Sequence, residues 1–200
     1  MPEPDSPAPA AAPAREAVLD AALALFARRG YEATTVEEIR RVSGASIGSI
    51  YHHFGGKEGI AAALYLRALT DYQAGFLAAL HARRGPRAGI EAVVRHDLDW
   101  IEAHPAAARL LLADREAQAA AGGSTELRDA NRAFFTAVQA WLAPHVAAGA
   151  IRSLDPDLFE ALVLGPSHEY ARHRLAGRAT TSAAAARRVL AAAAWSAVSP

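Results

Sequence analysis

Apolar side chains recur along this chain every three or four residues, which is the spacing of one face of an α-helix. The segment 15–29 shows the pattern first: Leu19, Leu23 and Phe26 share a face, and Gly30 follows as a helix stop. No segment alternates β-branched and polar residues with the period of two that is typical of a strand. The pattern therefore predicts an all-α fold.

Two short helices are expected next, separated by a tight turn. In the stretch TTVEEIRRVSG, Thr35 and Glu38 have the spacing of a capping box, and Gly44 can adopt the left-handed conformation that ends a helix. Ser46 follows almost at once and caps another helix, which ends at the glycine pair after Phe54. Two short helices joined in this way form a helix-turn-helix motif.

A longer helix is predicted to begin at Lys57 and to extend to about Leu80. Beyond it, glycine, proline and small polar residues separate further periodic segments. These segments predict helices at residues 90–104, 106–119, 126–145, 156–175 and 182–198, about nine helices in all. Pro166 is expected to bend the helix in which it lies.

The chain divides into three parts on this pattern. Residues 1–14 contain five prolines and neither a positive start nor an apolar stretch, so we expect a disordered arm rather than a signal peptide. Residues 15–60 hold the helix-turn-helix. Residues 61–200 form a second helical domain.

Composition limits the possible functions. The 200 residues are 52% hydrophobic and 21% charged, which is ample for a packed core. Formal net charge is zero, and residues 15–58 hold six basic and six acidic side chains, so nucleic-acid binding depends on where the charges lie. The absence of cysteine excludes disulfides and thiolate chemistry. With no export signal and no apolar run near the roughly 18 residues of a membrane span, we expect a soluble, cytoplasmic protein.

An enzyme is the competing class of function. The eight histidines form no His-x-x-x-His pair, and Glu169 with His173 has the spacing of a surface ion pair. The chain has no glycine-rich phosphate loop after a strand and no serine elbow. We therefore predict that the protein is not an enzyme and uses no metal and no cofactor.

The helix-turn-helix carries a more specific signal. The stretch TTVEEIRRVSGASIGSIYHHFGGKEGI resembles the N-terminal DNA-binding segment of the TetR/AcrR family of one-component transcriptional regulators. The likeness covers about residues 15–60 and rests on the capping box, Ile39, Gly44, Ser46, Gly48, the Tyr-His-His-Phe run and Lys57-Glu58. It implies a homodimeric regulator of double-stranded operator DNA, most often a repressor released by a small molecule.

The second helix of this motif has side chains that suit the DNA major groove. Gly48 lets the backbone approach base edges closely, while Ser46, Ser49 and Tyr51 offer small or planar hydrogen-bonding groups. Ile47 departs from the polar or basic residue that the family often has there, and it can contact a thymine methyl. Phosphate contacts are expected from Thr35, Tyr51, His52, Lys57 and either Arg40 or Arg41, with His53 either packed inside the domain or touching DNA.

Aromatic and histidine side chains of the second domain give a candidate effector site. One predicted helix carries His96, Trp100 and His104 on one face, a later one carries Phe134, Val138 and Trp141, and His168 can add a polar contact. Two facing stripes of this kind suit a small apolar or amphipathic effector. A plain hydrophobic core is the alternative for each of these residues, and the dimer interface is the alternative for His168.

The last two predicted helices are expected to pair with their copies in a second subunit as a four-helix bundle. The candidate interface residues are Leu158, Leu162, Val189 and Trp195. A helical adaptor or an effector-independent regulator that binds a protein partner remains the alternative function. A filled core in place of a cavity would favour that alternative.

Overall fold

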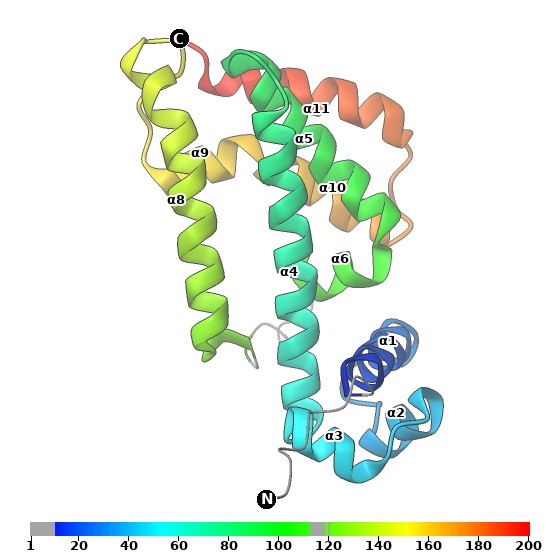
Figure 1. Ribbon diagram of the computed structural model, residues 1–200. Coiled ribbons are helices and arrows are strands. Elements are labelled where there is room, and N and C mark those ends of the chain that lie inside the picture. The colour runs from blue at the N-terminus through cyan, green and yellow to red at the C-terminus, as the bar shows by residue number, and fades with distance from the viewer. Residues whose placement is uncertain (1–10, 113–118, 120) are drawn as a thin grey trace, which may run out of the picture.

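The computed structural model describes residues 11–112, 119 and 121–200. This part of the chain is helical and contains no strand, so the predicted all-α fold is confirmed. None of its helices combines the length and apolar content needed to cross a membrane. The helices, shown in Figure 1, are α1 (Ala11–Arg29), α2 (Val36–Ser43), α3 (Ile47–Phe54), α4 (Lys57–His81), α5 (Pro86–Ala103), α6 (Pro105–Leu112), α8 (Thr125–Ala147), α9 (Pro156–Val163), α10 (Gly165–Leu175) and α11 (Ala183–Val198).

The first three helices gather at one end of the molecule around a small apolar core (Figure 1). Leu19, Ile39 and Ile50, one from each helix, have no exposed surface. Full burial of such a side chain contributes about 1.5–3 kcal/mol. Leu110 of α6 belongs to the same core, so the larger domain packs directly against the smaller one.

The long helix α4 runs from the small domain along the length of the molecule (Figure 1). Its first turns contribute Ile60 and Leu64 to the small core, and its C-terminal half contributes Phe76 and Leu80 to the core of the larger domain. The small core therefore continues past residue 60, where the sequence placed the domain boundary. One continuous helix belongs to both domains.

The larger domain has two groups of buried side chains. The first lies among α4, α5, α8, α9 and α11 and includes Ile90, Val94 and Val198. The second is smaller and lies among α4, α5, α6 and α10, with Trp100 and Ala171 as members. Helix α5 packs against both α4 and α11, which makes it the central helix of this domain (Figure 1).

Two glycines allow close helix contacts in the larger domain. A β-carbon on Gly75 of α4 would overlap the ring of His96 on α5, and one on Gly89 of α5 would overlap the indole of Trp141 on α8. Neither glycine has a positive φ angle. The fold therefore uses their lack of a side chain rather than their conformational freedom.

Most predicted helices are confirmed, with differences at their ends. Helix α1 begins at Ala11, inside the arm that was expected to be disordered, while residues 1–10 lie outside the described residues. Helix α5 begins at Pro86 rather than at residue 90, because proline suits the first turn of a helix. Helix α6 is described as far as Leu112, and most of the remaining predicted segment, to residue 119, lies outside the described residues.

The single helix predicted for residues 156–175 was wrong. The chain forms two helices there, α9 and α10, with Leu164 between them at φ −104° and ψ −25°. Pro166 explains the break, because proline has no N–H and its ring clashes with the carbonyl four residues earlier. The described chain consequently has ten helices where about nine were expected.

Candidate nucleic-acid interface and ligand cavity

Helix α2 starts and stops as its capping residues require. The Thr35 side chain accepts a hydrogen bond from the N–H of Glu38 (3.2 Å), and the Glu38 carboxylate accepts one from the N–H of Thr35 (2.9 Å), which completes the predicted capping box. This bond from the Thr35 backbone lowers the pKa of Glu38. Gly44 ends the helix in the left-handed conformation at φ 72°.

Helix α3 follows after three residues. The Ser46 side chain caps it by accepting a hydrogen bond from the N–H of Ser49 (3.1 Å), and Gly55 ends it at φ 71°. Ile50 anchors one face of the helix in the small core. The opposite face is thereby turned outward.

The outward face of α3 is small and apolar. Ile47 and Tyr51, one turn apart, are 45% and 53% exposed. Gly48 is also exposed, has no positive φ angle, and would meet nothing within 4 Å if it carried a β-carbon. Neither the backbone conformation nor packing against the described residues requires glycine at position 48. The face combines exposed apolar side chains with bare backbone, which suits close approach by a binding partner.

The two arginines of α2 differ in their partners. Arg40 donates from Nε and one terminal nitrogen to the Glu37 carboxylate at 2.8–3.0 Å. Arg41 is exposed and forms no ion pair within the described part of the chain. Of these two arginines, Arg41 is the one whose charge is available to an external phosphate.

Lys57, the only lysine of the chain, is the first residue of α4. Its ammonium donates to the carbonyl oxygens of Tyr31 (3.1 Å) and Glu32 (3.3 Å) and lies 4.2 Å from the centroid of the Tyr31 ring. These contacts tie the start of α4 to the segment that joins α1 and α2. An ammonium has three N–H groups, so one remains for another acceptor.

The other predicted DNA contacts lie on the same part of the molecule. Thr35 and Ser46 are exposed, Ser49 is half-buried, and His52 is exposed with its ring centroid 5.1 Å from that of His53. His53 is exposed as well, so it does not pack inside the small domain. All the predicted DNA contacts therefore belong to α2, α3, their caps and the start of α4.

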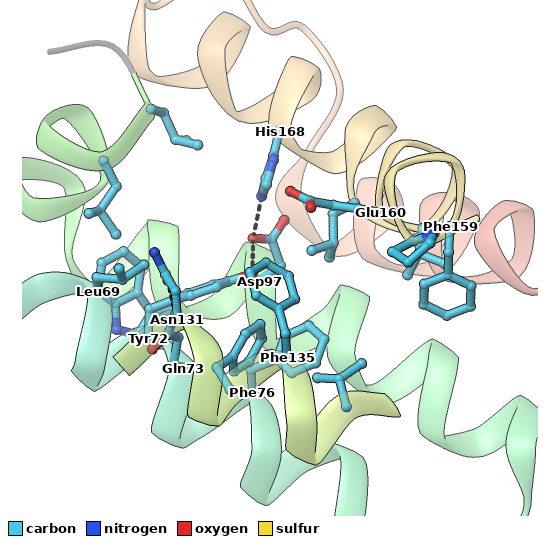
Figure 2. Close-up of a pocket in the computed structure, with 18 of the residues that line it drawn as sticks. Leu69, Tyr72, Gln73, Phe76, Asp97, Asn131, Phe135, Phe159, Glu160 and His168 are labelled. Carbon is cyan, nitrogen blue, oxygen red and sulfur yellow. Dashed lines mark hydrogen bonds and ion pairs between the residues drawn. The ribbon is translucent and has the colours of Figure 1, made fainter. Parts of the chain in front are cut away.

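The larger domain contains a cavity of about 470 Å³ among α4, α5, α6, α8, α9 and α10 (Figure 2). Its walls are mainly aromatic and aliphatic, with Tyr72, Phe76, Trp100, Phe134 and Phe159 among them. The Tyr72 ring centroid lies 5.3 Å from that of Trp100 and 6.2 Å from that of Phe76. The volume and lining are those of a small-molecule site.

A buried carboxylate stands at one end of this cavity. Asp97 is 1% exposed and accepts hydrogen bonds from the hydroxyls of Tyr72 (3.0 Å) and Ser167 (2.6 Å), while His168 Nε2 lies 3.2 Å from it. Figure 2 shows His168 and Tyr72 meeting at Asp97 from different helices. Burial, and then the charge of Asp97, raises the pKa of Tyr72 well above its usual value. The carboxylate joins α4, α5 and α10.

A pair of amides forms a second polar point of the lining. The side-chain nitrogen of Gln73 on α4 donates to the side-chain oxygen of Asn131 on α8 (2.9 Å). This bond leaves one amide acceptor and several amide N–H groups for another partner. The cavity is therefore amphipathic, with polar groups set in apolar walls.

Four of the seven predicted effector residues line this cavity: Trp100, Phe134, Val138 and His168. Trp100 also donates from its indole to Asp71 (2.7 Å). Their role in binding stays a prediction, although a cavity rather than a filled core is what the effector hypothesis requires.

The other three predicted residues lie outside the lining. His96 packs on Gly75 and bonds through Nε2 to the Tyr72 carbonyl oxygen (3.1 Å). His104 stacks on Trp100 with ring centroids 5.0 Å apart, and Trp141 packs on Gly89. Helical spacing indicated the correct face of each helix, but glycines on neighbouring helices decide which of these rings are packing contacts.

Comparisons with known proteins agree with this geometry. Residues 18–64 match the family model described as bacterial regulatory proteins, tetR family. The transcriptional repressor KstR2 of Rhodococcus jostii is 36% identical over 89 residues, which are 44% of each chain, so this chain spans less than half of that relative's length. The regulator RutR of Escherichia coli is 29% identical over 160 residues, 78% of this chain and 73% of RutR. A TetR-family regulator from Marinobacter aquaeolei has a TM-score of 0.79 at 19% identity, covering 94% of this chain and 96% of that one.

Residues 18–64 are therefore similar to the N-terminal segment of tetR-family regulators. The proteins that the chain matches are transcriptional regulators, which agrees with the prediction that the protein is not an enzyme. Within residues 11–112, 119 and 121–200, no three or more His, Asp or Glu side chains are grouped so that they could hold a metal ion.

The residues predicted for a TetR-family dimer interface fall into two groups. Leu158 of α9 and Val189 of α11 are 51% and 59% exposed. Leu162 and Trp195 are half-buried and pack against the core of the larger domain. Helices α9 and α11 contact each other. Leu158 and Val189 are therefore the exposed members of the predicted interface, and their contact with a second subunit stays a prediction.

Sequence reasoning missed most of the polar lining of the cavity. Asp97, Gln73, Asn131 and Glu160 were not predicted. Asp97 had a detectable signal, because it follows Val93 by four residues and so occupies the apolar face of its helix. A carboxylate at such a position requires buried donors, although the sequence cannot say which helices supply them.

Proposed function

We propose that this protein is a homodimeric repressor of the TetR family that binds a two-fold symmetric operator through α3. A small apolar or amphipathic molecule in the cavity of the larger domain releases it from DNA. It acts on DNA in the cytoplasm. The single observation that carries the DNA-binding part is the outward face of α3, with its exposed Ile47, Gly48 and Tyr51.

Glycine at position 48 is explained by an external partner. Nothing in the described part of the chain lies within 4 Å of a β-carbon at Gly48. A helix that enters the major groove brings its backbone close to base edges, and a missing side chain permits that approach. Ile47 beside it can contact thymine methyl groups, and Ser46, Ser49 and Tyr51 can donate to bases or phosphates.

Phosphate binding is proposed for the groups around α3. Arg41 is exposed and unpaired among the described residues, and His52 and Thr35 are exposed nearby. Lys57 keeps one ammonium N–H beyond its two bonds to carbonyl oxygens. Such contacts give affinity and register without reading the sequence.

Release by an effector is supported by the continuity between cavity and DNA-binding domain. Helix α4 begins at Lys57 beside α3 and carries Tyr72, Gln73 and Phe76 into the cavity wall. A molecule that fits the cavity better when α4 is displaced would favour a dimer whose α3 helices no longer match the operator spacing.

Dimerisation is supported by the exposed Leu158 and Val189 on α9 and α11. Two copies of α3 related by a two-fold axis read two half-sites about one helical turn apart. One copy alone would have half the contacts and far weaker discrimination between sequences.

The test is a titration of operator DNA, selected from random sequence, with the wild-type protein and with Gly48→Ala. We expect Gly48→Ala to raise helix stability by up to about 1 kcal/mol, because alanine favours helix more than glycine does. We expect the same change to weaken operator binding by about tenfold, the scale of one lost base contact. Fluorescence anisotropy and urea unfolding measure the two quantities.

The matched control is Gly165→Ala on α10, where a β-carbon also meets nothing within 4 Å. It should leave operator binding unchanged. If the wild type selects no sequence, or if its DNA binding does not depend on salt, the repressor proposal fails and an adaptor for a protein partner becomes the better hypothesis.

A further inference from the structure

One carboxylate in the cavity lining has no partner among the described residues. Glu160 of α9 lines the cavity, is exposed, and forms no side-chain hydrogen bond or ion pair in the described part of the chain. Figure 2 shows it on the same side of the cavity lining as Asp97 and His168, which lie beside it in this view. A carboxylate beside apolar walls favours a ligand that brings a positive charge or several hydrogen-bond donors.

Asp97 adds a second negative charge on this side. Its oxygens are already occupied by the Tyr72 and Ser167 hydroxyls and by His168, so it acts on a ligand through its charge rather than by direct bonding. Both Asp97 and Glu160 contribute, after burial, to the raised pKa of the Tyr72 hydroxyl. The two carboxylates therefore act on the same region of the cavity.

The one guanidinium among the described lining residues is already paired. Arg172 donates to the Glu169 carboxylate at 2.8 Å, and Glu169 is not part of the lining. The positive charge of Arg172 is thus balanced by a carboxylate that lies outside the cavity. His168 directs Nε2 to Asp97, so that nitrogen does not offset Glu160.

Aromatic rings surround the same space. Tyr72 lies against Phe76 and Trp100, and the Phe76 ring centroid is 5.2 Å from that of Phe134. Ring faces attract cations within about 6 Å of the centroid, and they pack against any apolar body. Neutral apolar ligands gain only the second of these effects.

We infer that the effector is an amphipathic cation: an apolar, ring-containing molecule whose protonated amine or quaternary ammonium group lies beside Glu160. The ammonium is attracted by Glu160 directly and by Asp97 at longer range, while the body fills the aromatic part of the cavity. The inference rests on the proposed function in that it takes this cavity as the effector site.

The test uses three probes with one naphthylmethyl body: a trimethylammonium, its uncharged carbon isostere, and a carboxylate. Binding is measured by isothermal titration calorimetry with the full-length wild type, with Glu160→Gln and with Asp157→Asn. Asp157 lies on the same helix and is exposed, but it does not line the cavity. We expect the ammonium to bind wild type about tenfold more tightly than the isostere, with the carboxylate weakest.

Glu160→Gln should reduce ammonium binding by about fivefold and leave the isostere unchanged, because it removes a charge and little volume. Asp157→Asn should change neither. Equal binding of the ammonium and the isostere, tighter binding of the carboxylate, or no binding of any probe at millimolar concentration would overturn the inference.

Operator binding without any probe is measured on the same three proteins. If they bind the operator and the probes show no preference for positive charge, the proposed repressor stands and the cationic effector fails. If they bind no operator but still prefer the ammonium probe, the cavity does favour cationic ligands and the proposed function fails.

Discussion

Lys57 combines two roles at a single nitrogen atom. The ammonium donates to two carbonyl oxygens of the segment between α1 and α2, and it lies over the Tyr31 ring. Lysine suits this position because a compact ammonium can serve several acceptors in different directions. An arginine would present a planar fork that matches carboxylates and phosphates better than two separate carbonyls. The residue therefore positions α4 while keeping one N–H for the proposed phosphate contact.

We predict that Lys57→Ala weakens binding to all DNA sequences alike and reduces the slope of log affinity against log salt by about 0.9, the effect of one phosphate contact. We also predict a loss of about 1–2 kcal/mol in the free energy of unfolding, because two carbonyls lose a charged donor. Arg41→Ala is the control: the same change in slope with less than about 0.5 kcal/mol of destabilisation. An unchanged slope for Lys57→Ala would mean that Lys57 only positions α4.

At the scale of elements, α5 is organised by a carboxylate on its buried face. Asp97 receives donors from α4 and α10, and without these partners its burial would be strongly unfavourable. The break between α9 and α10 serves the same contact, because Ser167 and His168 lie in the first turn of α10. A continuous helix would direct these two side chains elsewhere. Pro166 and Asp97 are therefore linked through the geometry of one hydrogen-bond network.

Replacing Asp97 should therefore lower the free energy of unfolding more than replacing the nearby Asp99. Asp97→Ala should lower the free energy of unfolding by about 3 kcal/mol, since the Tyr72, Ser167 and His168 side chains lose a buried acceptor. Asp99→Ala removes an exposed carboxylate that pairs with Arg187, and it should cost less than about 1 kcal/mol. Urea unfolding followed by circular dichroism compares them. Similar losses for both variants would show that the hydrogen bonds to Asp97 stabilise the fold no more than an exposed ion pair does.

At the scale of the whole molecule, two groups of exposed apolar side chains lie outside the cavity among the described residues. One is formed by Val42, Ile47 and Tyr51 of the helix-turn-helix, and the other includes Leu158 and Val189 on α9 and α11. Figure 1 shows the two helix pairs at opposite ends of the molecule. A two-fold dimer through α9 and α11 would leave both copies of α3 exposed for one DNA duplex.

Val189→Arg tests this arrangement more cleanly than Leu162→Arg. Val189 is 59% exposed, whereas Leu162 packs against the core and its replacement would also destabilise the monomer. We expect Val189→Arg to be monomeric by light scattering, because each copy would face the other with a buried positive charge. Val42→Arg, also at an exposed apolar position, should remain dimeric. A dimeric Val189→Arg would place the interface elsewhere.

The DNA-binding half of the molecule was predictable because its signals are local. The capping box of Thr35 and Glu38, the cap at Ser46 and the left-handed Gly44 each act within a few residues, and all three form as expected. Apolar spacing then determined which face of α3 is buried through Ile50. Sequence spacing alone therefore determined the helix-turn-helix and its outward face.

The ligand cavity depended on contacts between distant segments. Helical spacing could not distinguish Trp100, which lines the cavity, from His96 and Trp141, which fill space opposite Gly75 and Gly89. Asp97 and Glu160 line the same cavity although they lie on different helices, 63 residues apart in sequence. The sequence by itself determined the helices, their caps and their apolar faces, because these depend on neighbours along the chain. Only the tertiary structure decided which of those faces meet and where they leave a cavity, because packing joins residues far apart in sequence.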